Sequence, residues 1–484
     1  MRSLATPDLT GLPTEGVAII GGGVAGLATA LNLRDSDSDL EVTLFEKDPT
    51  CGGNLRTQAE NGWQIEYGPN GYLDNEPAMA RLIERLKLDD AVTPSNESAK
   101  KRFLMVNGEM VPIPTSPPAF LKSKMLPMTA KLRIAGEFFV PRRAGLGKAA
   151  DIPAGDETVA AFGRRRLGKA FTETMLDPMV KGISGGDAEN LSLAAAFPRM
   201  VEMEQEFGGL FKALIKKRKG DGSPTGVLHT FEGGMARLVL ALKNELEQDP
   251  SVSLQTGAST QSVTHTEEGW FVTTTESKHG PFSAVVAAAP AHAAAKQIAD
   301  LDQVLASTLA EIPFAPMAVI ALGFPRANVG HNLDGFGMLV PSKEKRRLLG
   351  MLWTSSIFPG RAPQDQVLIR AMAGGATDPA VMEMDDESLT KLALDEIRPL
   401  LQLSGEPTIV KVIRHEKAIA QYTPGHLARM KAIDSMRGQW PGLFFTGSSY
   451  RGIAVNACVK DAEKVAAEVI ANLNARKSQA AEVT

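Results

Sequence analysis

The feature that most constrains the fold is a glycine-rich turn near the N-terminus, entered by a short apolar run. Residues 17–20 read as a buried strand and residues 27–33 as a helix, and the turn between them is Gly21-Gly22-Gly23-Val24-Ala25-Gly26. Gly21 permits the turn, Gly23 lets the backbone approach a pyrophosphate, and Gly26 lets the helix pack closely on the strand. Free N–H groups at the helix N-terminus would face the anion. The sequence therefore predicts a dinucleotide-binding unit.

A second predicted strand, residues 41–46, ends at Glu46, twenty residues after Gly26. A carboxylate at that spacing is expected to bind the hydroxyls of an adenosine ribose. This half of the site does not by itself separate NAD from FAD. Two further turns follow at residues 51–57 and 66–71, and their glycines would let the backbone approach an extended dinucleotide.

Composition and charge exclude several classes of protein. The 484 residues are 43% hydrophobic and 22% charged, which suits a folded chain of about three domain-sized units. The net charge of −4 gives no basic field that would favour nucleic acid. Two cysteines and seven scattered histidines form no zinc or catalytic-triad pattern, so we expect no metal site. Without a signal peptide or a run of roughly 18 apolar residues, a cytoplasmic location is expected.

The dinucleotide signature returns later in the chain, at residues 230–238 and 442–447, with a buried strand at 284–290 and a helix at 462–473. We therefore predict an α/β fold, α+β overall, that contains a discontinuous Rossmann-like cofactor domain and a substrate domain with a mixed sheet. The predicted boundaries are 1–85, 225–300 and 435–484 for the cofactor domain, 86–115 and 301–434 for the substrate domain, and 116–224 for a helical domain.

Residues 116–148 differ in character from the rest of the chain. They contain seven Lys or Arg and one acid, interleaved with apolar side chains. This mixture suits an interfacial helix that contacts anionic lipid on the inner face of the membrane. A solvated helix packed on the protein's own core has the same pattern. Both alternatives stay open.

Internal segments resemble those of the protoporphyrinogen oxidases, a family in the superfamily of the amine oxidases. The turn at residues 51–57 resembles the Gly-Gly-x-x-Arg-Thr turn of that superfamily. More specific matches are Glu157-Thr158-Val159 with the arginines at 164–166, the segment QYTPGH at 421–426, and the closing motif at 447–458. The matches occur in order from about residue 17 to residue 473. The chain departs from the family's usual residues at Ala420 and Ala457.

This resemblance implies one FAD per chain, bound non-covalently. The implied contacts lie in the three turns, after the second cofactor segment and in the closing motif: Gly21, Gly22, Gly23, Val24, Ala25, Gly26, Glu46, Lys47, Gly53, Asn54, Gly68, Pro69, Asn70, Gly71, Thr260, Ser448, Ile453, Ala454 and Val455. Some amine oxidases attach FAD to a cysteine near the C-terminus. For Cys458, a small buried thiol is the simpler interpretation.

The implied activity is the oxidation of protoporphyrinogen IX to protoporphyrin IX. Six electrons would leave in three flavin cycles, with dioxygen as acceptor and hydrogen peroxide as product. The cofactor performs the redox chemistry, so no catalytic side chain is expected. Arg102 is predicted to pair with a propionate of the tetrapyrrole, and Leu339, Met351 and Leu352 to form apolar walls.

Several alternatives stay open at this point. Without the resemblance, Arg102 fits a solvated basic cluster, and core packing explains the apolar residues nearly as well. Coproporphyrinogen III, oxidised to coproporphyrin III, is the alternative substrate. An amine oxidase is the alternative enzyme and a non-catalytic escort protein the alternative class, and a homodimer is also left open.

Overall fold

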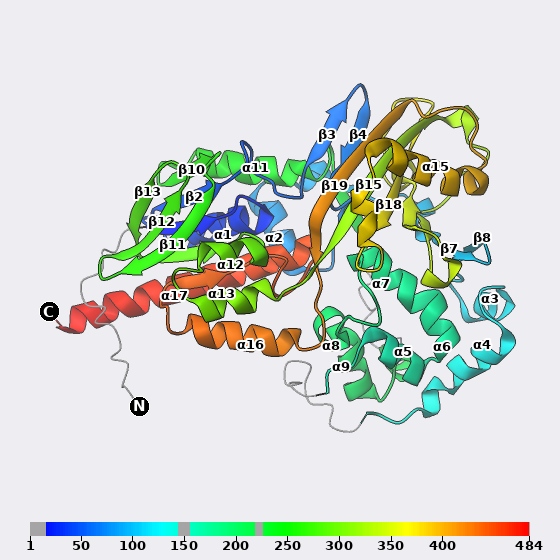
Figure 1. Cartoon of the computed structure of the whole chain (residues 1–484), viewed down its shortest axis with the longest axis horizontal. Helices are drawn as coiled ribbons and strands as arrows, with labels where there is room; N and C mark the ends of the chain where they lie inside the picture. Colours follow the sequence, from blue (N-terminus) through cyan, green and yellow to red (C-terminus); the bar gives the residue numbers. More distant parts are fainter. Residues whose placement is uncertain (1–15, 144–154, 218–225, 484) are drawn as a thin grey trace.

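The computed structural model describes residues 16–143, 155–217 and 226–483. Figure 1 shows two sheet-containing halves side by side, with a group of helices at the lower right, below the second half. Strands from distant parts of the sequence meet in each half. The α/β fold with a discontinuous Rossmann-like part is confirmed.

The first half contains five parallel strands in the order β10-β2-β1-β14-β20. Their bounds are Val17–Ile20 (β1), Val42–Glu46 (β2), Val252–Thr256 (β10), Ala284–Ala287 (β14) and Leu443–Phe445 (β20). Val17 lies opposite both Val42 and Ala284. The strands are short apolar runs because both faces of the sheet are covered.

Two cores cover the parallel sheet. One contains α1 (Val24–Ser36), α2 (Pro77–Arg85), α11 (Ala236–Glu247) and α17 (Val455–Val483). The other contains the sheet of β11 (Thr260–Thr266), β12 (Gly269–Thr274) and β13 (Lys278–Phe282), with α12 (Ala291–Gln297), α13 (Gln303–Ala310) and α16 (His426–Arg437). Ile19 packs in the first core and Ile20 in the second, as the alternation of a strand requires. α17 begins at Val455, earlier than the expected residue 462.

The second half is a seven-stranded sheet in the order β19-β15-β18-β17-β16-β7-β8. Its strands are β7 (Phe103–Val106), β8 (Glu109–Pro112), β15 (Phe314–Pro325), β16 (Gly337–Leu339), β17 (Leu348–Leu352), β18 (Gln366–Gly374) and β19 (Ile409–Ala420). Neighbours are antiparallel except β16 and β7. One face packs on α15 (Asp386–Leu401), and the other packs on the hairpin of β3 (Thr57–Glu60) and β4 (Trp63–Glu66).

A buried ion network holds the helical region together. Arg166, at the end of α5 (Val159–Arg166), is fully buried. It donates from Nε to Glu137 (2.7 Å) and from Nη1 to Glu204 in α9 (Pro198–Phe207; 2.9 Å). Both carboxylates are buried as well. The network fastens the segment around Glu137 to the helices α5 and α9.

The remaining described elements are small or lie in the helical region. They include α3 (Pro117–Lys122), α4 (Met128–Ala135), α6 (Lys169–Phe171), α7 (Asp177–Ser184), α8 (Leu193–Ala196), α10 (Leu210–Lys217), α14 (Thr354–Ile357), and the small sheet of β5 (Tyr72–Leu73), β6 (Val92–Pro94) and β9 (Leu228–Phe231). Within the described ranges, no helix is long and apolar enough to cross a membrane. The two main sheets draw their strands from the segments that the predicted domain boundaries group together, and the boundaries themselves stay a prediction.

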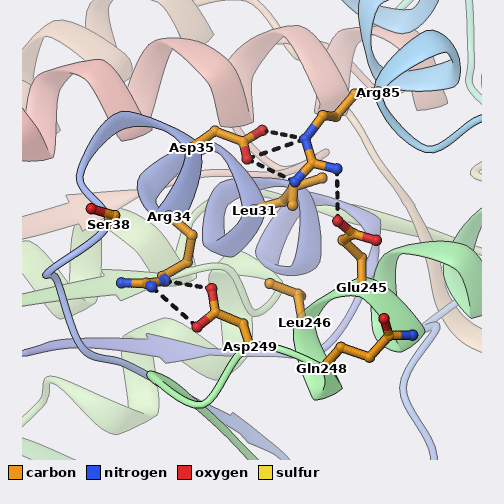
Figure 2. A pocket seen from close by; sticks show the side chains of 9 residues that line it. All are labelled: Leu31, Arg34, Asp35, Ser38, Arg85, Glu245, Leu246, Gln248 and Asp249. Atoms are coloured by element: carbon orange, nitrogen blue, oxygen red, sulfur yellow. Dashed lines mark hydrogen bonds and ion pairs between the residues drawn. The ribbon is translucent and has the colours of Figure 1, made fainter.

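A hollow between α1, α2 and α11 is lined by charged side chains (Figure 2). Arg85 donates to Asp35 (2.9 Å) and to Glu245 (2.7 Å), and Arg34 donates to Asp249 (2.7 Å). Two arginines face three carboxylates, and their ion pairs link α1 to α2, α2 to α11, and α1 to the residues after α11, so the hollow is a contact between helices. It lies away from the glycine turn at the other end of α1.

Candidate active site

The first glycine turn has the geometry that the sequence predicts. Gly21 has φ +111°, a left-handed value that favours glycine. A Cβ at Gly26 would lie 1.9 Å from the carbonyl oxygen of Gly21, so α1 packs on the turn with no room for a side chain. A Cβ at Gly23 would meet no heavy atom within 4 Å. Gly21 and Gly26 therefore shape the turn, whereas Gly23 leaves open space in front of α1.

The N-terminus of α1 has no cap of its own. Its N-cap residue, Gly23, has no side chain, and the first turn of the helix contains no acidic residue. The N–H groups of Val24 and Ala25 belong to the first turn of the helix, which lacks intrahelical acceptors. Such a helix end binds phosphate groups.

Glu46 lies at the end of β2 and is 6% exposed. Its two carboxylate oxygens accept N–H groups from Gly22 (2.7 Å) and Asp48 (2.8 Å). Each oxygen keeps a lone pair that could accept a ribose hydroxyl. Sequence reasoning did not foresee that Glu46 also fastens the glycine turn. Lys47 is exposed and forms no ion pair with a described residue, and its contact with the cofactor stays a prediction.

The second and third turns pack against the first. Gly52 N–H donates to Gly22 O (2.8 Å), and Gly53 has φ +56°. A Cβ at Gly68 would lie 2.1 Å from the carbonyl oxygen of Asn54. The second turn therefore lies against the first, at the N-terminus of α1, and the third lies against the second.

Two polar side chains in this part of the molecule have no partner. Both amide atoms of Asn70 are enclosed and unbonded among the described residues, as is Oγ1 of Thr260. Buried polar groups are normally hydrogen-bonded, so a polar ligand beside them would satisfy these atoms. Thr260 is the first residue of β11 rather than part of a loop. Pro69 lies between Gly68 and Asn70, and Gly71 packs so closely on His229 that a Cβ would lie 2.4 Å from its carbonyl oxygen.

The closing motif lies between β20 and α17. Tyr422 holds it, because its hydroxyl donates to Ser448 O (2.9 Å) and accepts from Gly452 N–H (2.7 Å). Ile453 and Ala454 follow, partly or fully exposed, and Val455 begins α17. The motif therefore presents a second helix N-terminus near the first. An extended dinucleotide fits this arrangement of open glycine, uncapped helix and unbonded polar atoms.

Three of the four residues predicted to contact the substrate lie on or beside one face of the seven-stranded sheet. Arg102 is exposed, and its guanidinium carbon lies 5.2 Å from the centre of the Phe336 ring. Leu352 is half-buried and packs near Phe336. Leu339 is half-buried and packs closely on Gly182 in α7, where a Cβ would lie 2.5 Å from the leucine side chain. The substrate contacts of all three stay predictions.

Met351 points to the opposite face of the sheet. It is 1% exposed and packs in the core beneath α15. Consecutive residues of a strand alternate between faces, so Met351 and Leu352 cannot both face the same ligand. The structure thus brings Leu352 and Arg102 together and separates Met351 from them.

Sequence reasoning missed several side chains on the face that carries Leu352. Met372 and Arg370 in β18 lie on it, as the pairing of Gly350 with Met372 and of Leu352 with Arg370 shows. Next to them, Glu66 forms a fully buried ion pair with Arg361. The alternating pattern of β18 was the available signal. It could not be used without knowing which strands lie next to β18.

The comparisons with known proteins agree with this geometry. The family model of flavin-containing amine oxidoreductases matches residues 24–470. A coproporphyrinogen III oxidase of Bacillus subtilis is 26% identical over 476 residues, covering 94% of this chain and 98% of the relative. The mitochondrial protoporphyrinogen oxidase of Nicotiana tabacum is 30% identical over 485 residues, covering 94% of this chain and 95% of the relative.

Solved structures share the fold over nearly the whole chain. A protein of Exiguobacterium sp. 255-15, provisionally assigned as a protoporphyrinogen oxidase, superposes with a TM-score of 0.79 at 23% identity and covers 95% of this chain and 99% of its own. Cyclohexylamine oxidase from Brevibacterium oxydans IH-35A gives a TM-score of 0.68 at 18% identity, covering 96% and 100%. The chain therefore belongs to the family of flavin-containing amine oxidoreductases and is an FAD-dependent oxidoreductase.

Proposed function

We propose that this oxidoreductase dehydrogenates a porphyrinogen, with protoporphyrinogen IX as substrate and protoporphyrin IX as product. The observation that carries the proposal is an unpaired guanidinium at the edge of an apolar face. Arg102 forms no ion pair with any described residue, and the side chains beside it are Phe336 and, across the face, Leu352. A tetrapyrrole offers a carboxylate to the guanidinium and a broad hydrocarbon surface to the apolar side chains. Relatives named for two porphyrinogen substrates support the proposal.

The chemistry assigns simple roles to the side chains of this chain. Oxidation of a porphyrinogen to a porphyrin removes six electrons, and bound FAD accepts two at a time, so the proposal includes three cycles with dioxygen as acceptor and hydrogen peroxide as product. Arg102 orients the macrocycle through a propionate. Leu339 and Leu352 keep water from its face. No side chain acts as an acid or a base.

Coproporphyrinogen III is the second candidate substrate. Coproporphyrinogen III oxidases of Bacillus subtilis and of Staphylococcus aureus match this chain over nearly its full length, at 26% and 27% identity. This porphyrinogen carries propionates where protoporphyrinogen carries vinyl groups. Arg102 would serve both substrates, so the apolar face must discriminate between them.

The decisive experiment offers both porphyrinogens to the yellow holoenzyme in parallel. Porphyrin fluorescence and hydrogen peroxide should rise together, and anaerobic addition of the true substrate should bleach the flavin. We expect higher kcat/KM with protoporphyrinogen IX. A preference for coproporphyrinogen III would select the second candidate. Bleaching by primary amines but by neither porphyrinogen would overturn the proposal in favour of an amine oxidase.

We also propose that the chain contacts the membrane surface from the cytoplasmic side through its helical region. The helices α3 and α4 and the turn that follows expose five large apolar side chains. These are Leu121 (55% exposed), Met128 (57%), Leu132 (67%), Phe138 (41%) and Phe139 (86%). Lys122 and Lys124 flank them. Apolar side chains ringed by lysines favour reversible binding to anionic lipid.

Sedimentation with vesicles tests this surface. Wild-type protein should pellet with anionic vesicles at low salt and be released at high salt, because salt screens the lysines. The double variant Leu132→Asp/Phe139→Asp should stay in the supernatant. Val304→Asp, which replaces an equally exposed apolar residue in α13, should pellet like wild type. Wild-type protein that stays in the supernatant would contradict membrane contact. Sedimentation in the absence of vesicles tests whether the chain forms a homodimer.

A further inference from the structure

The seven-stranded sheet contains a buried arginine that the proposed reaction does not use. Arg370 lies in the middle of β18 and is 7% exposed. Its Nε is enclosed without a partner, and the guanidinium forms no hydrogen bond or ion pair with any residue in the described ranges. Burial lowers its pKa to about 10, so it remains charged near neutral pH.

The groups around Arg370 do not neutralise it. Glu66 is the carboxylate next to it, but this carboxylate already pairs with Arg361 and accepts from Thr57 Oγ1 (2.7 Å) and Met235 N–H (3.0 Å). His415 is kept neutral near pH 7 because burial lowers its pKa, with Arg370 adding to the effect. One buried carboxylate therefore faces two buried guanidinium groups, and a positive charge is left over.

A buried charge without a partner costs several kcal/mol, which most folds avoid. The other deeply buried arginines show this, because Arg166 pairs with two carboxylates and Arg361 with one. Arg370 differs from them because it has no such partner among the described residues. An acceptor from outside the chain would remove the imbalance.

The strand pairing shows which face of the sheet carries Arg370, and the residues packed on that face indicate which ligand is close. Arg370 lies on the face of β18 that also carries Leu368 and Met372, and this face packs on Trp63, Ile65 and Tyr67. His415 in β19 links this sheet to the segment that follows β4, since its Nε2 lies 2.9 Å from the carbonyl oxygen of Tyr67. Tyr67 immediately precedes the Gly68–Gly71 turn, which is predicted to contact the flavin.

We propose that Arg370 binds the oxygen-bearing edge of the FAD ring system and stabilises the negative charge that this edge acquires on reduction. Uptake of two electrons and one proton by the neutral ring leaves one negative charge on it. A guanidinium offers several N–H donors and stays protonated, so it favours the reduced form over the oxidised form. Arg370 is thereby assigned a role in setting the reduction potential. The proposal rests on the cofactor alone and does not depend on the identity of the substrate.

The test measures the reduction potential of bound FAD in the holoenzyme by equilibration with a redox dye, with no porphyrinogen present. Arg370→Met should bind reduced FAD at least about tenfold less tightly relative to oxidised FAD, which lowers the potential by about 30 mV. Arg370→Lys should lie between this variant and wild type. Arg414→Met removes an exposed, Asp386-paired arginine from β19, which β15 separates from β18, and should leave the potential unchanged.

The possible results separate three roles. A lowered melting temperature with an unchanged potential in Arg370→Met would make Arg370 structural and overturn the proposal. An unchanged potential with a raised KM for the porphyrinogen would assign Arg370 to a substrate carboxylate and also overturn it. If Arg370→Met loses FAD altogether, Arg370→Lys is compared with the neutral Arg370→Gln. Equal potentials in those two variants would reject a role for the charge.

Discussion

The parallel sheet and the seven-stranded sheet contribute to the active site with different parts of the chain. On the parallel sheet we expect the contacts with the cofactor to come mainly from backbone, because Gly21 and Gly26 shape the turn and Gly23 leaves space open in front of the N–H groups of α1. On the seven-stranded sheet they come from side chains that alternate along β17 and β18, with Leu352 and Arg370 on one face and Met351 on the other. A change in the first half should therefore act through the fold or the cofactor. A change in the second should alter rates or potentials and leave FAD bound.

The largest effect is expected for Gly26→Ala. The new Cβ, which is fixed to the backbone of α1, would lie 1.9 Å from the backbone oxygen of Gly21, so α1 would have to move away from β1. We expect the free energy of unfolding to fall by about 3 kcal/mol or more, with loss of FAD. Denaturant titration and the visible spectrum measure both. Gly136→Ala is the control, since a Cβ there meets nothing within 4 Å and the backbone is helical (φ −69°). A Gly26→Ala protein that is stable and yellow would contradict the expectation that close backbone packing shapes the cofactor site in the half with the parallel sheet.

Gly23→Val should separate cofactor binding from folding. Gly23 has an extended backbone (φ −74°) and no neighbour within 4 Å of a Cβ, so valine fits the fold. The side chain would occupy the space predicted for the pyrophosphate, and we expect FAD affinity to fall at least about a hundredfold, or about 3 kcal/mol. The protein should be folded by circular dichroism and colourless. Full retention of the flavin spectrum would show that the pyrophosphate lies elsewhere.

The same contrast explains how much could be predicted from the sequence. Close backbone approach requires glycine at fixed positions, so residues 21–26 directly predict the turn and its neighbouring strand and helix. The spacing to Glu46 adds the ribose site. The sequence could not show that Glu46 also binds Gly22 N–H, because that bond depends on how the turn packs against β2.

The seven-stranded half was less predictable because its site depends on the order of strands. β17 and β18 pair with each other, and β16 pairs with β7, more than 200 residues earlier in the chain. Only this pairing reveals that Arg370 and Leu352 lie side by side. Without it, the sequence groups Met351 with Leu352 although their side chains point to opposite faces, and nothing singles out Arg370 in a mostly apolar strand.

Arg102→Ala tests whether this side chain of the seven-stranded half acts on the substrate alone, and not on the fold or the cofactor. The guanidinium is exposed and makes no ion pair with a described residue, so its removal should spare the fold and the flavin spectrum. We expect kcat/KM for the porphyrinogen to fall by an amount equivalent to about 1.5–3 kcal/mol, the contribution of a hydrogen bond to a charged group. Arg102→Lys should recover only part of the loss, because an ammonium cannot form the bidentate pair. Wild-type efficiency in both variants would leave Arg102 as a solvated surface residue.

The smallest effect is expected for Cys458, a side chain in the half where backbone makes the contacts. Cys458 is 6% exposed in the first turns of α17, and burial raises its pKa to about 12. A raised thiol pKa means that the reactive thiolate appears only at high pH, so little of it is present at pH 8. We therefore expect acid precipitation to release all FAD, Cys458→Ser to keep the wild-type spectrum and kcat, and a disulfide reagent to leave the native protein unmodified at pH 8. Burial raises the pKa of Cys51 to about 11, so the same protection holds there and reaction should begin only on unfolding. Flavin that stays with the precipitated wild-type chain but is released from Cys458→Ser would establish a covalent thioether. That result would break the comparison, because a side chain would then hold the cofactor in the half that otherwise relies on backbone.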